Sequence, residues 1–134
     1  MSGTETNYSA VIEESSMELT ARDRIKFKDT QNAISLLDMA RDAKMNNAKA
    51  VIDNIKGYVT LNIHNDASAD KDYKNFVIVD GAGNKYVTGS LSFMRSFMDI
   101  FNEMKNEPEA WSIELNLLPS KNYKDKEILT CSLV

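Results

Sequence analysis

The chain of 134 residues is poor in residues that build covalent cross-links or metal centres, with one cysteine and one histidine. The single thiol, Cys131, cannot form a disulfide within the chain, and it rules out a cysteine-based zinc site. No run of about 18 apolar residues is present, so no transmembrane helix is predicted. The first residues lack a basic stretch followed by an apolar one, so no secretory signal is predicted and the cytoplasm is the default expectation.

Basic residues are also in deficit, 16 against 20 acidic ones, which gives a net charge of −4. The acidic excess lies in residues 1–19, which contain four glutamates and no lysine or arginine. The rest of the chain is therefore neutral overall. Such a chain can form a basic groove, but its long-range attraction to phosphate should be modest. We expect residues 1–19 to be a flexible acidic segment, with a candidate short ordered piece at residues 8–12.

The sequence offers little material for catalysis. His64, on the polar face of a predicted strand, is more readily explained as a solvated or binding-face side chain than as a catalytic base. Cys131 lies on the more apolar face of the last predicted strand, which indicates a buried structural thiol. The aspartates of residues 65–72 lack the glycine and closing glutamate of a calcium loop. We therefore expect no enzymatic activity, no metal and no cofactor.

The second half of the chain has a clear element order. Alternating apolar residues predict strands at residues 58–64, 73–80, 85–88, 111–117 and 127–134, and apolar residues at helical spacing predict a helix at 91–104. Gly81 to Asn84 reads as a hairpin turn and Ser90 as a helix N-cap. The order β-β-β-α-β-β predicts a mainly β fold with one main helix, a five-stranded OB-type barrel over residues 55–134 within one domain of residues 20–134.

The preceding region gives weaker signals. Ile25 and Phe27 alternate with Arg24, Lys26 and Lys28, which predicts a strand with a basic face over residues 20–30. Two interpretations stay open, a solvated edge strand and a phosphate-contacting ribbon. Residues 31–45 favour a short helix, residues 46–47 a turn, and residues 48–56 a weak strand.

Four tyrosines interleave with basic residues, which is the composition that stacking on single-stranded nucleic acid requires. The phenylalanines of the predicted helix are assigned to the core, and the only tryptophan, Trp111, is better explained as core than as a stacking platform. The tyrosines fall on the middle strands and on the loop between the last two strands, where OB folds bind. The candidate nucleic-acid-binding residues are Arg24, Lys26, Tyr58, Tyr73, Lys74, Lys85, Tyr86, Lys121, Tyr123 and Lys124.

Residues 57–134 resemble the single-stranded DNA-binding proteins of small tailed phages that replicate by protein priming. The shared features are the strand at 58–64, the hairpin at 76–86, the helix at 90–104 and the closing strands around residues 120–124. The resemblance implies coating of single-stranded DNA during phage replication or recombination, without sequence preference and without a cofactor. It implies single-stranded DNA and replication or recombination proteins as partners in the host cytoplasm.

The negative charge and the acidic first segment favour one alternative. The same fold can serve as a small phage protein-interaction or inhibitor module that does not bind nucleic acid. An enzyme acting on nucleic acid ranks last, because the sequence contains no metal-ligand cluster.

Overall fold

A computed structural model describes residues 8–120 and 126–134. Within these ranges the chain forms eight strands and three helices. In chain order they are β1 (Tyr8–Ser15), α1 (Ala21–Lys28), β2 (Ile34–Ser35), α2 (Leu36–Met45), β3 (Ala50–Ile52), β4 (Ile55–Asn65), β5 (Asp72–Asp80), β6 (Lys85–Thr88), α3 (Leu91–Met104), β7 (Ile113–Pro119) and β8 (Glu127–Leu133). None of the helices in the described ranges is long and apolar enough to cross a membrane.

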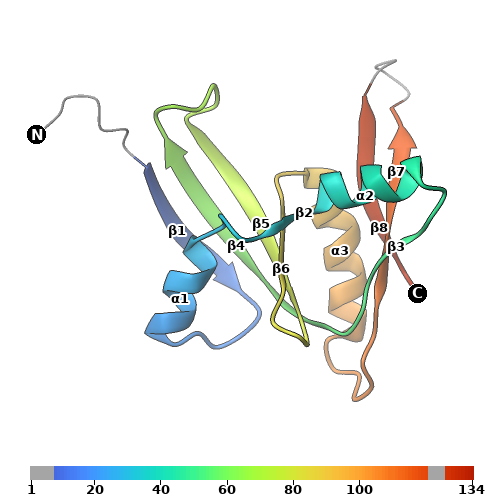
Figure 1. The fold of residues 1–134 in the computed structure, drawn as a ribbon. Coiled ribbons are helices and arrows are strands. Elements are labelled where there is room, and N and C mark those ends of the chain that lie inside the picture. Colours follow the sequence, from blue (N-terminus) through green and yellow to red (C-terminus); the bar gives the residue numbers. More distant parts are fainter. Residues whose placement is uncertain (1–7, 121–125) are drawn as a thin grey trace, which may run out of the picture.

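The strands form two sheets with α3 packed between them (Figure 1). The five-stranded sheet, here sheet A, has the order β1-β4-β5-β6-β2, and the three-stranded sheet, sheet B, has the order β3-β7-β8. Asn54 takes a positive φ of 57° between β3 and β4. The chain bends at this point, so that β3 joins sheet B and β4 joins sheet A. One bent run of chain therefore connects the two sheets.

The predicted mainly β architecture is confirmed, but the two sheets do not close into a barrel. The outer edge of β6 pairs in parallel with the short strand β2 instead of with β8. Helix α2 starts directly after β2 and packs against β6 and β7. Lys44 and Arg41 of α2 reach Glu127 at the start of β8, with N–O distances of 2.9 and 3.7 Å. These segments, which precede β3 in the chain, occupy the place where a closing strand pair would form.

The types and order of the elements predicted for the second half of the chain are confirmed, with strand ends that differ by up to three residues. The predicted helix at residues 91–104 coincides with α3, and the Ser90 side chain accepts a hydrogen bond from the Phe93 N–H as an N-cap. The hairpin between β5 and β6 turns at residues 81–84, with Gly83 at a φ of 88°. The short helix predicted within residues 31–45 is α2, and Asn47 at a φ of 51° forms the turn that follows.

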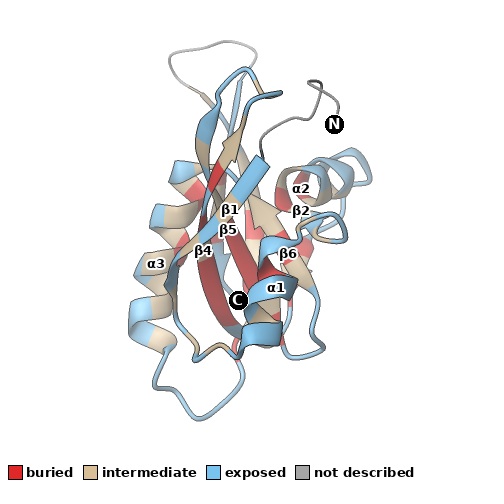
Figure 2. Ribbon diagram, turned by 90° about the vertical axis from the view of Figure 1, so that its left-hand side faces the viewer, coloured by how far each residue is buried: buried red, intermediate tan, exposed pale blue. Residues whose placement is uncertain are grey.

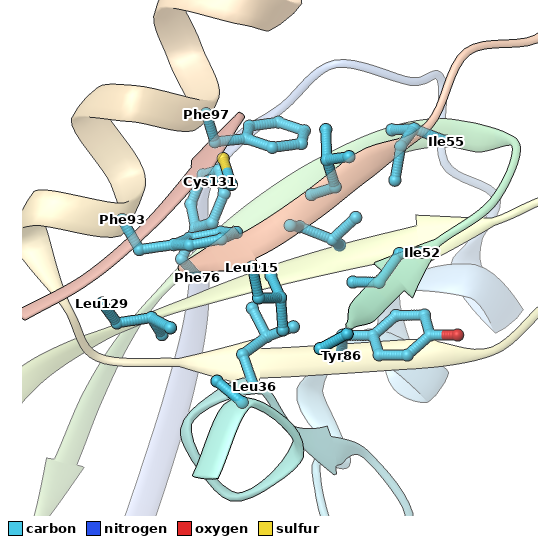
Figure 3. Close-up of a cluster of buried hydrophobic side chains, with 14 of the residues drawn as sticks. Leu36, Ile52, Ile55, Phe76, Tyr86, Phe93, Phe97, Leu115, Leu129 and Cys131 are labelled. Atoms are coloured by element: carbon cyan, nitrogen blue, oxygen red, sulfur yellow. The ribbon is translucent and has the colours of Figure 1, made fainter. Parts of the chain in front are cut away.

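The main core lies between the two sheets and is rich in aromatic rings (Figure 3). Phe93 and Phe97 of α3 are fully buried, and Phe97 packs against Phe76 of β5 with ring centroids 5.3 Å apart. Trp111 is also buried in this cluster, in agreement with its assignment to the core. Cys131 lies here too, and burial raises the pKa of its thiol, although Ser96 partly offsets this effect. The cysteine is therefore a structural side chain, as its position on β8 predicted.

A second apolar cluster covers the opposite face of sheet A. Val59, Leu61 and Ile63 of β4 contribute to it, as the alternation in the sequence predicted, and Val77 of β5 lies beside them. Helix α1 places Phe27 on this cluster, so α1 and α3 lie on opposite faces of sheet A (Figures 1 and 2). Both faces of the two central strands are thus buried over much of their length.

The structure corrects two predictions for the first thirty residues. Residues 8–15 are not a flexible segment, because β1 pairs with β4 along its length, from Tyr8 opposite Asn65 to Ser15 opposite Val59. Residues 21–28 form a helix and not a strand. The cause is a capping box, in which the Thr20 hydroxyl accepts from the Asp23 N–H while the Asp23 carboxylate accepts from the Thr20 N–H. Residues 1–7 lie outside the described part of the chain.

Candidate nucleic-acid interface

Two of the four predicted stacking tyrosines are core residues. Tyr58, predicted on a polar strand face, is 5% exposed, stacks on Phe76 and donates its hydroxyl proton to Glu14. Tyr86 is 7% exposed and donates to Asp80 over 2.8 Å. The alternation in the sequence is real, but the second face of the strand is covered by α3. Neither ring is accessible to a base in this arrangement.

Burial and the acidic acceptors have the same effect on both phenols. Burial, together with the hydrogen bond to Glu14, raises the pKa of Tyr58 to about 12. Burial and the hydrogen bond to Asp80 likewise raise the pKa of Tyr86 to about 12. Each hydroxyl therefore remains a proton donor throughout the neutral range, and it fixes its ring within the core.

Two of the predicted cationic contacts have partners within the protein. The ammonium group of Lys85 donates to the carbonyl oxygens of Lys26 and Asp29, at 2.6 and 2.7 Å, and so caps the C-terminal end of α1. Lys74 is exposed, and its ammonium group lies 3.1 Å from Glu13 of β1. Lys85 therefore acts mainly on the position of α1, and Lys74 must exchange a surface ion pair before it binds phosphate.

Arg24 and Lys26 lie on α1 with exposed side chains. The helix carries four basic residues, Arg22, Arg24, Lys26 and Lys28, and a single acidic one, Asp23, which is engaged in the capping box. Arg24 and Lys28 are one helical turn apart and line a hollow of about 630 Å³ between α1 and β1. Its lining also includes Glu18 and the apolar residues Ile12, Met17 and Leu19. The basic face predicted for this segment therefore exists, on a helix in place of a strand.

Three of the four predicted tyrosines lie in the described residues, and of these only Tyr73 remains at the surface. It is half-buried against the second apolar cluster on the α1 side of sheet A, and the residue borders two hollows of about 440 and 610 Å³. The first hollow extends over β4 and β1, and its lining side chains, such as Val11, His64 and Lys74, project to the side of sheet A opposite the Tyr73 ring. The second hollow lies beside the β4–β5 loop and the start of α3. Lys121, Tyr123 and Lys124 lie outside the described residues.

A fifth tyrosine, not singled out from the sequence, lies on the same side of sheet A. Residues opposite each other in an antiparallel pair project to the same side, and the register places Ala10 opposite Ile63 and Ile63 opposite Tyr73. Tyr8 lies two residues before Ala10 and so shares this side, with 51% of its surface exposed. Two strand spacings of about 4.8 Å separate β1 from β5, which places Tyr8 and Tyr73 on the order of 10 Å apart.

The charge on sheet A differs between its two sides. The side with Tyr8 and Tyr73 also carries the basic helix α1 and Lys85. On the other side Glu14 contacts Tyr58, and Glu13 pairs with Lys74. The arrangement can therefore bind an anionic polymer on one side, with aromatic rings at one end and cations at the other.

No three His, Cys, Asp or Glu side chains come together as a metal site anywhere in residues 8–120 and 126–134. The residues brought together on the α1 side of sheet A are suited to stacking and to charge pairing. Comparisons of the chain with protein-family models, with curated proteins and with solved structures found no match.

Proposed function

We propose that this protein binds single-stranded DNA without sequence preference on the side of sheet A that carries Tyr8, Tyr73 and α1. The observation that carries the proposal is the position of Tyr73. Its half-buried ring lies on the same side of the sheet as the basic helix, and the residue borders the hollow beside the β4–β5 loop. Stacking of bases on exposed rings tolerates any sequence, and cations along the backbone path add affinity.

The pairing of the strands supports the assignment of an OB-type topology. The segment β3–β4 is one bent run that pairs with β5 through its second half and with β7 through its first half. The hairpins β5–β6 and β7–β8 and the helix between them follow in the OB order. We take the fold as an opened OB-type barrel in which β2 and α2 replace the closing contact. OB folds bind oligonucleotides over the second and third strands and the adjoining first loop, here β5, β6 and residues 65–72.

The biological role follows from the resemblance of residues 57–134 to phage single-stranded DNA-binding proteins. It is the coating of single strands exposed during phage DNA replication or recombination. The net charge of −4 makes the expected affinity depend more on stacking than on long-range attraction.

The proposal is tested by titrating the protein into a fluorescein-labelled thymidine oligonucleotide and following anisotropy at two salt concentrations. Anisotropy is preferable to intrinsic fluorescence because Trp111 is buried in the main core, away from Tyr73. We expect saturable binding that weakens with salt, with a log–log slope of roughly −2 to −3 for about four phosphate contacts. A duplex of the same length should bind more weakly, because its bases are already stacked on one another.

Two variants of one residue separate stacking from packing. Tyr73→Leu keeps an apolar side chain on the second cluster but removes the ring, and it should weaken binding by about tenfold, since a stacked base contributes roughly 1–3 kcal/mol. Tyr73→Phe keeps the ring and should bind like the wild type. No binding at low salt would overturn the proposed function, and equal binding by both variants would remove Tyr73 from the interface.

A further inference from the structure

The only histidine lies between two carboxylates that flank one loop. Nδ1 of His64 is 2.7 Å from a carboxylate oxygen of Asp72, and Nε2 is 2.9 Å from a carboxylate oxygen of Asp66. A neutral imidazole has one N–H and can donate to only one of these groups. The arrangement with both contacts formed therefore belongs to the imidazolium, which has a proton on each nitrogen.

These contacts tie the two ends of the β4–β5 loop to each other. Asp66 follows the last residue of β4, and Asp72 is the first residue of β5. The backbone adds two further ties, from the Asn65 N–H to the Lys71 carbonyl at 2.7 Å and from the Ser68 N–H to the Asn65 carbonyl at 3.1 Å. Main-chain hydrogen bonds thus close the base of the loop, and the His64 side chain adds a second set of contacts that holds it.

The loop forms one wall of the hollow beside Tyr73. Ser68 and Asp70 line this hollow together with Tyr73 and Lys74. His64 and Asp72 themselves line the hollow on the opposite side of sheet A, at the same end of β4 and β5. The conformation that His64 stabilises is therefore the one that shapes the surroundings of the candidate stacking platform.

We propose that His64, as an imidazolium, is a positioning residue that holds the β4–β5 loop beside Tyr73, so that binding of single-stranded DNA strengthens as the pH falls from about 8 to about 5.5. This rests on the proposed function. Two effects act in the same direction. The two contacts of His64 to Asp66 and Asp72, here called the clasp, keep the loop in place and so keep the hollow beside Tyr73 formed. The added positive charge offsets two carboxylates that would otherwise repel a phosphate.

The direction of the pH dependence follows from the partners of the imidazole. The hydrogen bond to Asp72 raises the pKa of His64, and Asp66 adds to this effect, while the small degree of burial opposes it. A raised pKa in the folded state means that the clasp is complete below the ordinary histidine value of about 6.5 and is lost as the pH rises through the folded value. Other charged groups near the clasp are Asp70 and Lys71 in the loop, Lys74 on β5 and Glu13 on β1.

The first measurement needs no DNA. Nuclear magnetic resonance spectra of the full chain should show the His64 ring signals and the amide signals of residues 65–72 titrating together, at a pH above the ordinary value for histidine. Asp66→Asn and Asp72→Asn should each lower that midpoint. Asp70→Asn removes the same charge from the same loop and serves as the control, with a midpoint close to that of the wild type. A ring titration that leaves the loop amides unchanged would overturn the clasp.

The second measurement follows DNA affinity across the same range with a thymidine oligonucleotide, whose bases and phosphates do not change charge between about pH 5.5 and 8. The wild type should bind about threefold or more tightly at the lower pH, and His64→Gln should show less than about half of that change on a logarithmic scale. Binding by the wild type that does not depend on pH would overturn the positioning role and leave the proposed function standing. No binding at any pH would overturn both, whatever the spectra show for the loop.

Discussion

The ammonium group of Lys85 on β6 lies 2.6 Å from the carbonyl oxygen of Lys26 and so holds the end of helix α1 against sheet A. The last four carbonyls of a helix have no partners within it, and a cation there also interacts favourably with the helix dipole. Lys85, which lies 59 residues from Lys26 in the sequence, provides both the hydrogen bond and the positive charge. A residue that the sequence suggests for phosphate binding therefore serves to attach the basic helix.

Lys85→Met should loosen α1 without changing the packing of the side-chain stem. We expect a loss of about 1–2 kcal/mol in unfolding free energy, typical of hydrogen bonds from a charged donor. Hydrogen exchange should accelerate over residues 21–28 more than elsewhere. Lys49→Met, at an exposed position before β3, is the matched control. Unchanged exchange in α1 would show that the Phe27 contact alone holds the helix.

A second prediction concerns the buried pair of Tyr86 and Asp80. Burial raises the pKa of Asp80, but hydrogen bonds from Asn84, Tyr86 and the Ala82 N–H outweigh this and lower it overall. A lowered carboxyl pKa stabilises the fold above the ordinary value of about 3.9 and ceases to do so as the pH falls through the folded value. Tyr86→Phe should therefore cost about 1–2 kcal/mol near neutral pH.

The same substitution should cost less in acid, because a protonated Asp80 no longer benefits from the phenol as a donor. Urea unfolding at neutral pH and below about pH 4 measures the difference. Tyr58→Phe is a suitable comparison, since its acceptor Glu14 is an exposed carboxylate that water can solvate. An equal loss for Tyr86→Phe at both pH values would contradict the role assigned to the ionised Asp80.

The sequence predicted the second half of the fold because its signals there are local. The hairpin around Gly83, the N-cap Ser90 and the apolar period of α3 lie within a few residues of the structure that they determine. In the first thirty residues two apolar side chains, Ile25 and Phe27, suggested a strand. Ile25 is 71% exposed, and the local signal that decides the structure is the capping box from Thr20 to Asp23.

The candidate site was harder to predict, because it depends on contacts between distant segments. Nothing near Tyr58 indicates that Glu14 accepts its proton from 44 residues away, or that α3 covers its face of the strand. Likewise nothing near Tyr8 indicates that its segment joins the edge of sheet A. Which tyrosines remain exposed is decided by the order of strands and by the helices on each face, which a single sequence does not reveal.

The outer edge of β8 pairs with no strand in sheet B, and serines of α3 hydrogen-bond to it instead. This contact gives a further prediction. Ser92 donates to the Leu129 carbonyl at 2.9 Å, and Ser96 accepts from the Cys131 N–H at 3.1 Å. Ser96→Ala should leave this amide without a partner and cost about 1–2 kcal/mol, although alanine is the better helix former. Denaturant unfolding measures the loss, with Ser9→Ala on exposed β1 as the control.

The double variant Ser92→Ala with Ser96→Ala should also uncover the edge of β8. An unprotected edge strand can pair with another chain, so we expect the double variant to self-associate as its concentration rises. Sedimentation velocity at several concentrations checks this. A double variant that stays monomeric while being less stable would show that the serines satisfy the backbone but do not protect the edge.

The last prediction concerns the charge on α1. Arg24→Glu with Lys28→Glu reverses both cations at the hollow between α1 and β1. If the DNA backbone follows this side of sheet A, the variant should bind single-stranded DNA about tenfold or more weakly at low salt, and its salt slope should fall by about one to one and a half. Lys49→Glu with Lys105→Glu changes the net charge equally at exposed positions away from Tyr73 and should retain most of the affinity. If both pairs weaken binding to the same extent, the cations of α1 act only through the net charge, and the proposed path of the DNA along α1 is wrong.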